Sequence, residues 1–331
     1  MPRMTASVLA TLLGVSRSAV SRAFTPGTRL DPAKREMILQ AARTHGYQPN
    51  VFASTLSTPN SRSRSHLVAI LMGDFANPFQ SWLFAELTRE LQAHGKLPVL
   101  LNVDEVEALD QAILRLGSYQ VDGVLAVVGS LAENCLAQCV NLELPLVLLG
   151  RSDPGGRVPS VQTDNHLAGR LAAEHLLARG ARRTGFLEGR MDGEASRARG
   201  AGFAAAIQAA GLEPPCVLTA GRYSHAAGLA IWQTHAQLLT ELDGLFCASD
   251  TLAMGVVDGG RHMPTLANLQ IVGCDDIPQA GWSAYRLTTI AQPVRRLASE
   301  AVQRLLQRIE TPATDEALAV TYLPPTLICR S

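Results

Sequence analysis

The sequence predicts a small all-α head followed by a large two-lobed α/β body with parallel, Rossmann-like sheets. The head prediction rests on a helix-turn-helix pattern between Ala10 and Arg22. The body prediction rests on a series of unbroken apolar runs after residue 66, separated by Ala-rich amphipathic stretches. Strands of parallel sheets are covered on both faces, so they appear as continuous apolar runs. With 331 residues, 47% of them hydrophobic, the chain has room for two or three domains.

Charge is distributed unevenly, although the formal net charge is 0. Residues 1–66 contain nine Lys and Arg residues and two acidic ones, which gives +7 on this part and −7 on the rest. A basic head on an acidic body favours a polyanion as the partner of the head alone.

Several classes of protein are disfavoured. No stretch of about 18 apolar residues is free of charges and breakers, so no membrane span is expected. No apolar core follows Arg3 as it would in a signal peptide. The six Cys residues lack the partners of a zinc site, and buried free thiols in a reducing cytoplasm are expected. Without a phosphate-binding Gly loop or a nucleophile–base pair, we expect neither a cofactor nor catalysis.

The head is expected to contain three short helices. Thr5 can cap the first helix and Ser16 the second, because hydroxyl oxygens accept from the free amides at a helix start. Gly14 suits the sharp turn between them, since Gly takes φ > 0 without a Cβ clash. The third helix is expected between Asp31 and Gly46. Apolar residues on one side of the first two helices are expected to form a small core: Leu9, Leu12, Leu13, Val15 and Val20.

Residues 49–65 are expected to connect the head with the body. Asn50 can cap one more helix over 51–57, which is too short to be stable alone, and a polar linker follows it. The predicted domains are a helix-turn-helix head over 1–48, a short helix and linker over 49–65, and an α/β body over 66–331.

The body is expected to form two Rossmann-like lobes, because its strands are too many for one small sheet. The first lobe is expected over about 66–161 and 293–320, and the second over about 162–292 and 321–331. The predicted strands are 67–72, 97–103, 123–128, 145–149, 184–187, 216–219, 244–248 and 270–274, with helices around 82–94, 167–179 and 199–210. Such sheets bind ligands at the carboxyl ends of their strands, so a ligand is expected between the lobes.

A set of short motifs runs in order along nearly the whole chain. The motifs are Gly14-Val15-Ser16, Val20-Ser21-Arg22, Gly46-Tyr47-x-Pro49-Asn50, Asn77-Pro78-Phe79, Asp122-Gly123-Val124, Thr163-Asp164-Asn165, Arg199-x-x-Gly202-Phe203, Ser249-Asp250, Gly273-Cys274-Asp275-Asp276-Ile277-Pro278 and Leu287-Thr288-Thr289-Ile290-x-Gln292-Pro293. Each motif alone is weak, but the ordered set resembles the lactose/galactose repressor family of bacterial transcription regulators. The resemblance implies a DNA-binding head and a periplasmic-binding-protein-like body.

The chain departs from the family pattern at three places. Val8 stands where the family usually has an acid, residues 25–27 are Thr-Pro-Gly where Asn is usual, and Cys274 replaces a common aromatic residue. The first two departures are expected to affect the stability of the head, and the third the wall of the ligand pocket.

The resemblance implies which residues contact DNA. Arg17 and Ser18 would read base edges and Arg22 would read or clamp beside them, because an Arg donates two hydrogen bonds to guanine. Leu56 would wedge into the minor groove and bend the operator. The alternatives are solvated polar residues on an exposed helix and, for Leu56, an ordinary apolar residue at a domain junction. The remaining predicted contacts are Thr5, Ser16, Ser21, Asn50 and Ala53.

By the same resemblance, a small polar effector would lie between the lobes. Arg199 and Asp275 are the leading contacts, since a guanidinium donor beside a carboxylate acceptor suits a polyol or sugar. Arg151 and Arg197 would add positive charge, which raises a sugar acid or phosphosugar as a hypothesis, and a structural ion pair is the alternative for Arg151. The remaining predicted lining residues are Phe75, Phe79, Tyr223, Asp250 and Gln292, of which Phe79 and Tyr223 can stack on a ring.

The resemblance implies a ligand-responsive transcription regulator, a repressor, that binds a palindromic operator as a homodimer in the cytoplasm. Ligand binding would move the lobes and change the spacing of the two hinges, and the sequence leaves open whether this releases or promotes DNA binding. A dimer is favoured over a tetramer because no Leu heptads follow the last strand. A periplasmic solute-binding protein and an α/β enzyme fused to a head are the alternatives.

Overall fold

The computed structural model describes residues 4–25, 27–48, 65–103, 116, 119–127, 144–190, 193–261, 268–311 and 320–330. The chain divides into two compact units, Met1–Ser65 and His66–Ser331, which are the head and the body. No helix within the described residues is both long enough and apolar enough to cross a membrane.

The head consists of α1 (Ala6–Leu13), α2 (Arg17–Ala23) and α3 (Pro32–Thr44). Side-chain oxygens of Thr5, Ser16 and Asp31 each accept the amide three residues ahead, at 3.3, 3.2 and 2.9 Å. Gly14 ends α1 at φ +64°, a conformation in which a Cβ is unfavourable. The caps and the turn predicted from the sequence are therefore present.

The core of the head differs from the prediction at one residue. Leu9 and Val20 are fully buried, and Leu13 and Val15 pack against them in part. Leu12, which was expected to join them, is 55% exposed. Residues four apart share one face of a helix, so Leu12 lies with the exposed Val8 on the side of α1 that points away from the core.

Within the described residues, the body contains two six-stranded sheets with the orders β11-β5-β4-β3-β1-β2 and β12-β10-β9-β8-β6-β7. The first sheet is formed by β1 (Leu67–Met72), β2 (Leu97–Asn102), β3 (Gly123–Val127), β4 (Leu146–Leu149), β5 (Ser160–Thr163) and β11 (Val320–Leu323). The second is formed by β6 (Thr184–Glu188), β7 (Cys216–Thr219), β8 (Gly244–Cys247), β9 (Gln270–Asp275), β10 (Thr288–Ala291) and β12 (Thr326–Ile328). Neighbouring strands are parallel, except that β12 runs antiparallel to β10.

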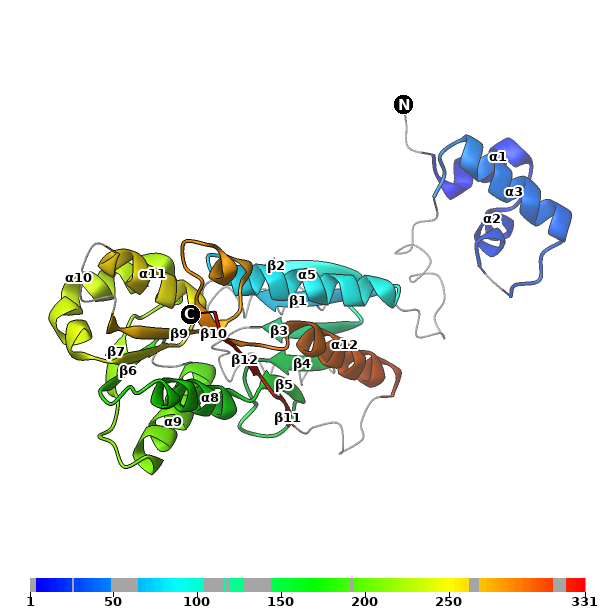
Figure 1. Ribbon diagram of the computed structural model, residues 1–331. Helices are drawn as coiled ribbons and strands as arrows, with labels where there is room; N and C mark the ends of the chain where they lie inside the picture. The colour runs from blue at the N-terminus through cyan, green and yellow to red at the C-terminus, as the bar shows by residue number, and fades with distance from the viewer. Residues whose placement is uncertain are drawn as a thin grey trace. The chain divides into compact units, whose positions relative to one another are not determined.

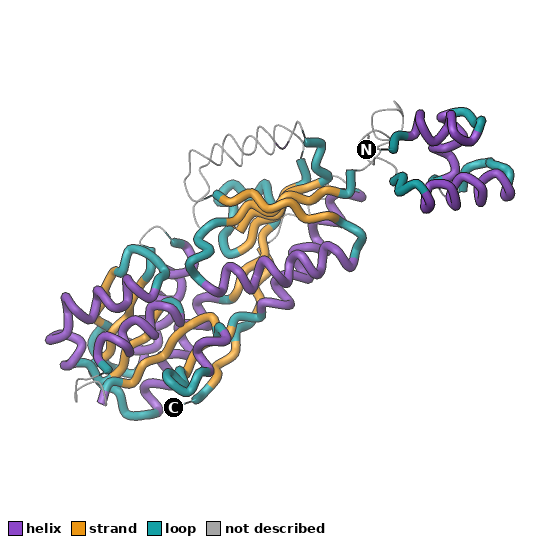
Figure 2. Tube along the Cα trace, turned by 90° about the horizontal axis from the view of Figure 1, so that it is seen from above, coloured by secondary structure: helices purple, strands orange, loops and turns teal. Residues whose placement is uncertain are grey.

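Helices cover these sheets and explain their unbroken apolar runs. On the first sheet, α12 (Val294–Glu310) packs over β3, β4 and β5 and beside α5 (Pro78–Ala93). The second sheet has α8 (Asn165–Ala178) and α9 (Glu194–Ala209) on one face and α10 (His225–Glu241) and α11 (Asp250–Gly260) on the other, as Figure 1 shows. Figure 2 shows the same flanking of strands by helices from a perpendicular direction. The central strands β1, β3 and β4 are accordingly buried along their whole length.

The two lobes of the body are joined by three crossovers. They follow β5, follow β10, and connect β11 with β12. Because β11 pairs with β5 along its whole length, residues 162–163 and 321–323 belong to the first lobe rather than to the second, where the sequence pattern placed them. The amide of Asp164 donates to the carbonyl of Leu323 at 2.8 Å, so two of the crossovers lie side by side.

Candidate functional site

Helix α2 has a polar and basic face. Its exposed residues are Arg17, Ser18, Ser21 and Arg22, and its buried residues are Ala19, Val20 and Ala23. The guanidinium Nε of Arg22 donates to the carbonyl of Ser18 at 3.3 Å, which places Arg22 along the helix beside the predicted base readers. The hydroxyl of Ser16 caps the helix and lies 3.0 Å from that of Ser18. This second helix of the turn therefore offers the side chains that a major groove requires.

The end of α2 is held by Arg35 of α3. Its guanidinium donates to the carbonyls of Ala23 and Thr28 at 3.0 and 2.9 Å, and to the carbonyl of Thr25 at 3.3 Å. Charge counting assigns Arg35 to the basic surface of the head, but these contacts give it a structural role. It ties the end of α2 and the loop after it to α3.

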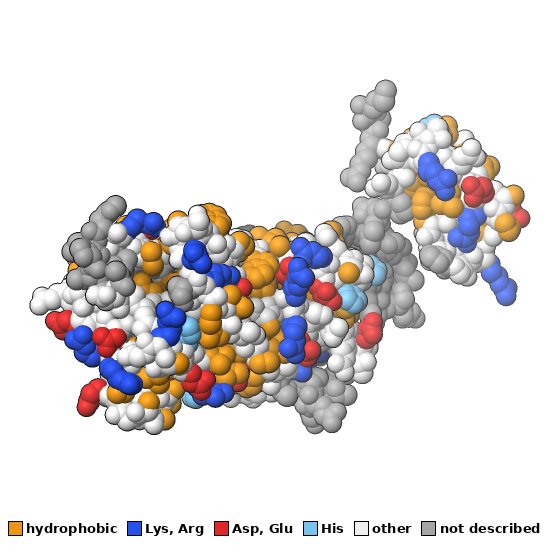
Figure 3. Space-filling model, in the orientation of Figure 1, with side chains coloured by type: hydrophobic (Ala, Val, Ile, Leu, Met, Phe, Trp, Pro, Cys, Tyr) orange, Lys and Arg blue, Asp and Glu red, His pale blue; other side chains and the backbone are white. Residues whose placement is uncertain are grey.

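Of the other predicted DNA contacts, the structure describes Thr5 but not Asn50, Ala53 or Leu56. Thr5 is exposed at the start of α1, where its hydroxyl caps the helix. Asn50, Ala53 and Leu56 lie outside the described residues, so their roles stay predictions of the sequence. Figure 3 shows that, on the visible face of the body, basic and acidic side chains are interspersed rather than gathered by sign.

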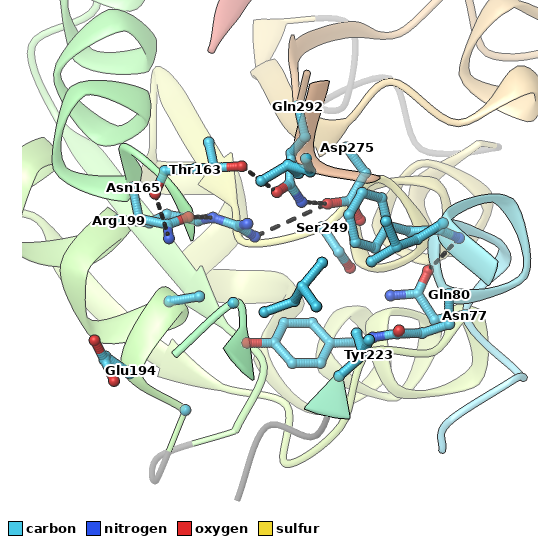
Figure 4. A pocket seen from close by; sticks show the side chains of 18 of the residues that line it. Asn77, Gln80, Thr163, Asn165, Glu194, Arg199, Tyr223, Ser249, Asp275 and Gln292 are labelled. Atoms are coloured by element: carbon cyan, nitrogen blue, oxygen red, sulfur yellow. Dashed lines mark hydrogen bonds and ion pairs between the residues drawn. The ribbon is translucent and has the colours of Figure 1, made fainter. Parts of the chain in front are cut away.

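A pocket lies between the two lobes of the body, at the carboxyl ends of strands from both sheets (Figure 4). It holds about 880 Å³ of space, including the part that is open to solvent. The first lobe contributes Asn77, Phe79, Gln80, Leu83, Val127, Leu149, Gly150, Thr163 and Leu297. The second contributes Asn165, Arg190, Gly193, Glu194, Ala195, Arg199, Tyr223, Ser249, Asp275 and Gln292.

Arg199 is the central cation of this pocket. It projects from α9 and is only 5% exposed. Its Nε donates to Oδ1 of Asn165 at 2.8 Å, and one terminal nitrogen donates to the carbonyl of Ala248 at 2.5 Å. The same nitrogen lies 4.0 Å from Oδ1 of Asp275. These contacts hold the guanidinium in one position, which is what a fixed donor to a ligand needs.

Asp275 connects the pocket with two of the crossovers. It is the last residue of β9, and its φ of +124° shows a constrained backbone. The side-chain amide of Gln292 donates to Asp275 at 2.7 Å, and the hydroxyl of Thr163 donates to Gln292 at 2.7 Å. Figure 4 shows this chain of side chains beside Arg199. Asp275 is thus linked by hydrogen bonds to residues beside two of the segments that join the lobes.

Burial shifts the titration of the acids in this region. It raises the pKa of the Asp275 carboxyl, against the lowering effect of Arg199, and the nearby charge of Asp250 raises it further. Burial likewise raises the pKa of Asp250. The thiol of Cys274 also has a raised pKa because it is buried, so it stays protonated at neutral pH. Within the described residues, no group of His, Cys, Asp and Glu side chains is arranged to hold a metal ion.

Of the predicted pocket residues, the structure brings together Phe79, Arg199, Tyr223, Asp275 and Gln292. Four others do not line the pocket. Phe75 packs edge-on against Phe84, with ring centroids 6.1 Å apart. Arg151 follows β4 but is not among the lining residues. Arg197 is exposed, because residues two apart on a helix point in different directions.

Asp250 is the fourth exception, and it lies behind the pocket wall. It is fully buried, and its carboxylate accepts from the amide of Ile277 at 2.9 Å and the hydroxyl of Thr289 at 2.5 Å. A Cβ on Gly273 would lie 2.2 Å from Asp250 Oδ1, so the carboxylate occupies the space over β9 that this Gly leaves. Its role is to fix the turn after β9.

Sequence reasoning missed Gln80, Asn165, Glu194 and Ser249 as lining residues. Asn165 and Ser249 come just after β5 and β8, so the rule that ligands bind at the carboxyl ends of strands points to them. Gln80 and Glu194 lie in the first turns of α5 and α9. In α/β folds these helix starts face the same edge of the sheet, which was the available signal.

Comparison with known proteins gives the same architecture. Residues 173–331 match the family described as periplasmic binding protein-like domain. The chain is 29% identical over 312 residues to the ribose operon repressor of Halalkalibacterium halodurans, covering 91% of this chain and 89% of that protein. It is 26% identical to the solved complex of the transcriptional regulator CelR with cellobiose, with a TM-score of 0.75 and 99% of each chain covered. The Lac repressor bound to ONPG is 25% identical, with a TM-score of 0.85, and the match covers 99% of this chain and 98% of that one.

The likeness spans both units of the chain. It includes the helix-turn-helix of the head and the two parallel sheets of the body. Over nearly its whole length the chain is therefore similar to bacterial transcription regulators of the kind that its sequence motifs resemble.

Proposed function

We propose that the protein is a ligand-responsive, sequence-specific DNA-binding transcription regulator that acts as a repressor. The observation that carries this proposal is the exposed polar and basic face of α2, held on a capped helix-turn-helix. Arg17 and Ser18 are proposed to read base edges, with Arg22 beside them. Leu56 is proposed to enter the minor groove, as the family pattern implies.

The operator is proposed to be palindromic and bound by a homodimer. One head reaches only a few base pairs, and two heads related by a two-fold axis read two matching half-sites. The related Lac repressor is known as a dimer on its operator, which supports this assembly. A DNA partner supports a cytoplasmic location, and the named relatives are regulators, which supports a role without catalysis.

The pocket of the body is proposed to bind a small polar effector. Arg199, Asp275 and Asn165 supply donors and acceptors on one wall, and Phe79 and Tyr223 supply rings. The cellobiose and ONPG complexes of related regulators support a sugar-like ligand. The effector would change the relation of the lobes through Gln292 and the crossovers, a coupling free energy between two sites.

The test is selection of binding sites from a randomised duplex DNA library by the full-length protein. We expect enrichment of a two-fold symmetric sequence, and sedimentation of the protein as a dimer both free and on that sequence. The proposal would be contradicted by enrichment of an asymmetric site, or by no enrichment of any sequence at an ionic strength of about 0.1 M. Salt must be fixed, because phosphate contacts make affinity fall steeply with salt.

A further inference from the structure

Within the described residues, two basic and two acidic side chains line the pocket. They are Arg190, Arg199, Glu194 and Asp275. Arg199 donates to Asn165 and to the carbonyl of Ala248 and lies 4.0 Å from Asp275, so the protein engages its guanidinium before any ligand binds. The two further Arg residues predicted in the cleft do not line it. The positive charge that the sequence predicted for the cleft is therefore reduced to Arg190 and Arg199.

Glu194 contributes a negative charge that is held in place. It is the first residue of α9 in the second lobe, but its carboxylate accepts from the first lobe. The amide and hydroxyl of Ser152 donate to it at 3.0 and 2.8 Å, and the side-chain amide of Gln162 donates at 3.3 Å. Figure 4 shows Glu194 at the edge of the pocket, apart from the Arg199–Asp275–Gln292 network. A fixed carboxylate beside a ligand disfavours a second negative charge.

The two lobes differ in the chemistry that they present. The apolar side chains Phe79, Leu83, Val127, Leu149 and Leu297 all come from the first lobe, whereas the charged ones come from the second. Beside the apolar wall, the buried Oε1 of Gln80 has no donor among the described residues. An unsatisfied buried acceptor is costly, and a ligand hydroxyl would satisfy it.

We propose that the pocket selects an uncharged, hydroxyl-rich ring with one nonpolar face or substituent, and that Glu194 excludes anionic relatives of this ligand. The hydroxyls meet Arg199, Asp275 and Gln80, and the nonpolar part meets the wall of the first lobe. This inference rests on the proposed function, because it takes the same pocket to be the effector site.

The experiment uses matched sets of probes with the full-length protein. The sets are D-glucose, D-gluconate, glucose 6-phosphate, methyl and phenyl β-D-glucoside; D-ribose, D-ribonate and ribose 5-phosphate; and adenosine with adenosine monophosphate. Melting temperature identifies binders, because a ligand of the native state stabilises it, and calorimetry then gives Kd. We expect an uncharged probe to bind at least about tenfold more tightly than its anionic counterparts, and a glycoside with a nonpolar group to bind at least as tightly as its parent sugar.

The variant Glu194→Gln tests the specific role of the carboxylate. It removes the charge but keeps an acceptor for Ser152, so the affinity of the anionic probe should rise relative to that of its neutral counterpart. The matched control is Glu174→Gln on α8, whose carboxylate is exposed and pairs with Arg170 at 3.0 Å in the same lobe. It should leave the ratio of affinities unchanged. Melting curves of both variants verify that they are folded.

Three outcomes would overturn the proposal. They are tighter binding of an anionic probe than of its neutral counterpart, an unchanged affinity ratio in Glu194→Gln, and no melting shift with any probe. The last outcome leaves the DNA-binding role to be decided by operator selection, so failure of the ligand class and failure of the proposed function are distinguishable.

Discussion

The buried pair of Arg199 and Asp275 shows how single residues decide the behaviour of the pocket. Asp275 is 2% exposed and its pKa is raised by burial, which means that the fold favours its protonated form. Its ordinary pKa in an unfolded chain is about 3.9. Between that value and the raised one, the folded protein binds a proton that the unfolded chain does not. The free energy of unfolding must therefore fall as pH rises through this window.

Comparison with Asp275→Asn isolates this effect, because the amide cannot titrate. We expect the stability of the native protein relative to the variant to fall between pH 5 and the raised pKa, by at most about 1.4 kcal/mol per pH unit. Above the raised pKa the difference should become constant. Urea unfolding at pH 5, 6, 7 and 8 measures it. A difference that grows with pH would show that the fold prefers the carboxylate, contrary to the expectation.

Arg17 gives a second prediction at the residue scale. Replacement by Ala should weaken binding to the selected operator by about 1–3 kcal/mol and relax the preference at one base pair of each half-site. Arg43→Ala is the control, since Arg43 is also exposed and basic but lies near the end of α3. It should change affinity without changing which bases are preferred. Fluorescence anisotropy with operator variants separates the two, and equal preferences in wild type and Arg17→Ala would exclude base reading by Arg17.

Helix pairs in the second lobe pack with their backbones in close approach. A Cβ on Gly169 of α8 would lie 2.0 Å from the carbonyl oxygen of Arg199, and one on Gly202 of α9 would lie 2.0 Å from that of His166. Gly228 of α10 and Gly255 of α11 meet backbone oxygens at 2.2 Å in the same way. These glycines are thus required by helix crossings rather than by turns.

Gly169→Ala should therefore push α9 away from α8 and move Arg199 with it. We expect a loss of about 1–3 kcal/mol in stability, as for other overpacked sites, together with weaker binding of any probe that contacts Arg199. Gly281→Ala is the control, because a Cβ there would meet only the side chain of Arg330, at 3.9 Å. Thermal melts and calorimetry give both quantities. A melting temperature equal to that of the control would refute the crossing argument.

The elements predicted from the sequence are those whose pattern is local. Strands such as β1 and β4 are unbroken apolar runs, and the pattern located them within a residue or two. Strands β5 and β10 were missed because they are four residues long and rich in Thr, Ser and Gln. Strand β11 pairs with β5 over a large separation in sequence, which no local pattern records.

The same limit applies to the pocket. The roles of Arg199 and Asp275 came from family resemblance, and the structure places both at the pocket. Arg197 and Asp250 were expected there too. Arg197 is instead exposed on α9, and the side chain of Asp250 fills the space over Gly273. Both depend on tertiary packing, so composition and spacing alone do not specify them.

At the scale of the whole molecule, the head and the body each have a core of their own. Leu9, Val20 and Ile38 are fully buried in the head, while the cores of the body surround its two sheets. A fragment that begins at His66 should therefore fold alone and bind the effector as the full chain does. Calorimetric unfolding and titration of this fragment with a neutral probe check the expectation. Aggregation of the fragment, or an affinity reduced more than about tenfold, would show that the head supports the pocket.

The hydrogen-bonded series Thr163–Gln292–Asp275 connects the pocket with the segments that join the two lobes. In many two-lobed proteins, a ligand is held between the lobes at a distance from the segments that connect them, and it acts on these segments by closing the lobes. A ligand at Asp275 would be one hydrogen bond from Gln292 and two from Thr163. Thr163 is the last residue of β5 and Gln292 follows β10, and after both strands the chain crosses to the other lobe. Under the proposed function, a ligand bound at Asp275 would act directly on the segments that join the lobes, even where it is too small to contact both lobes.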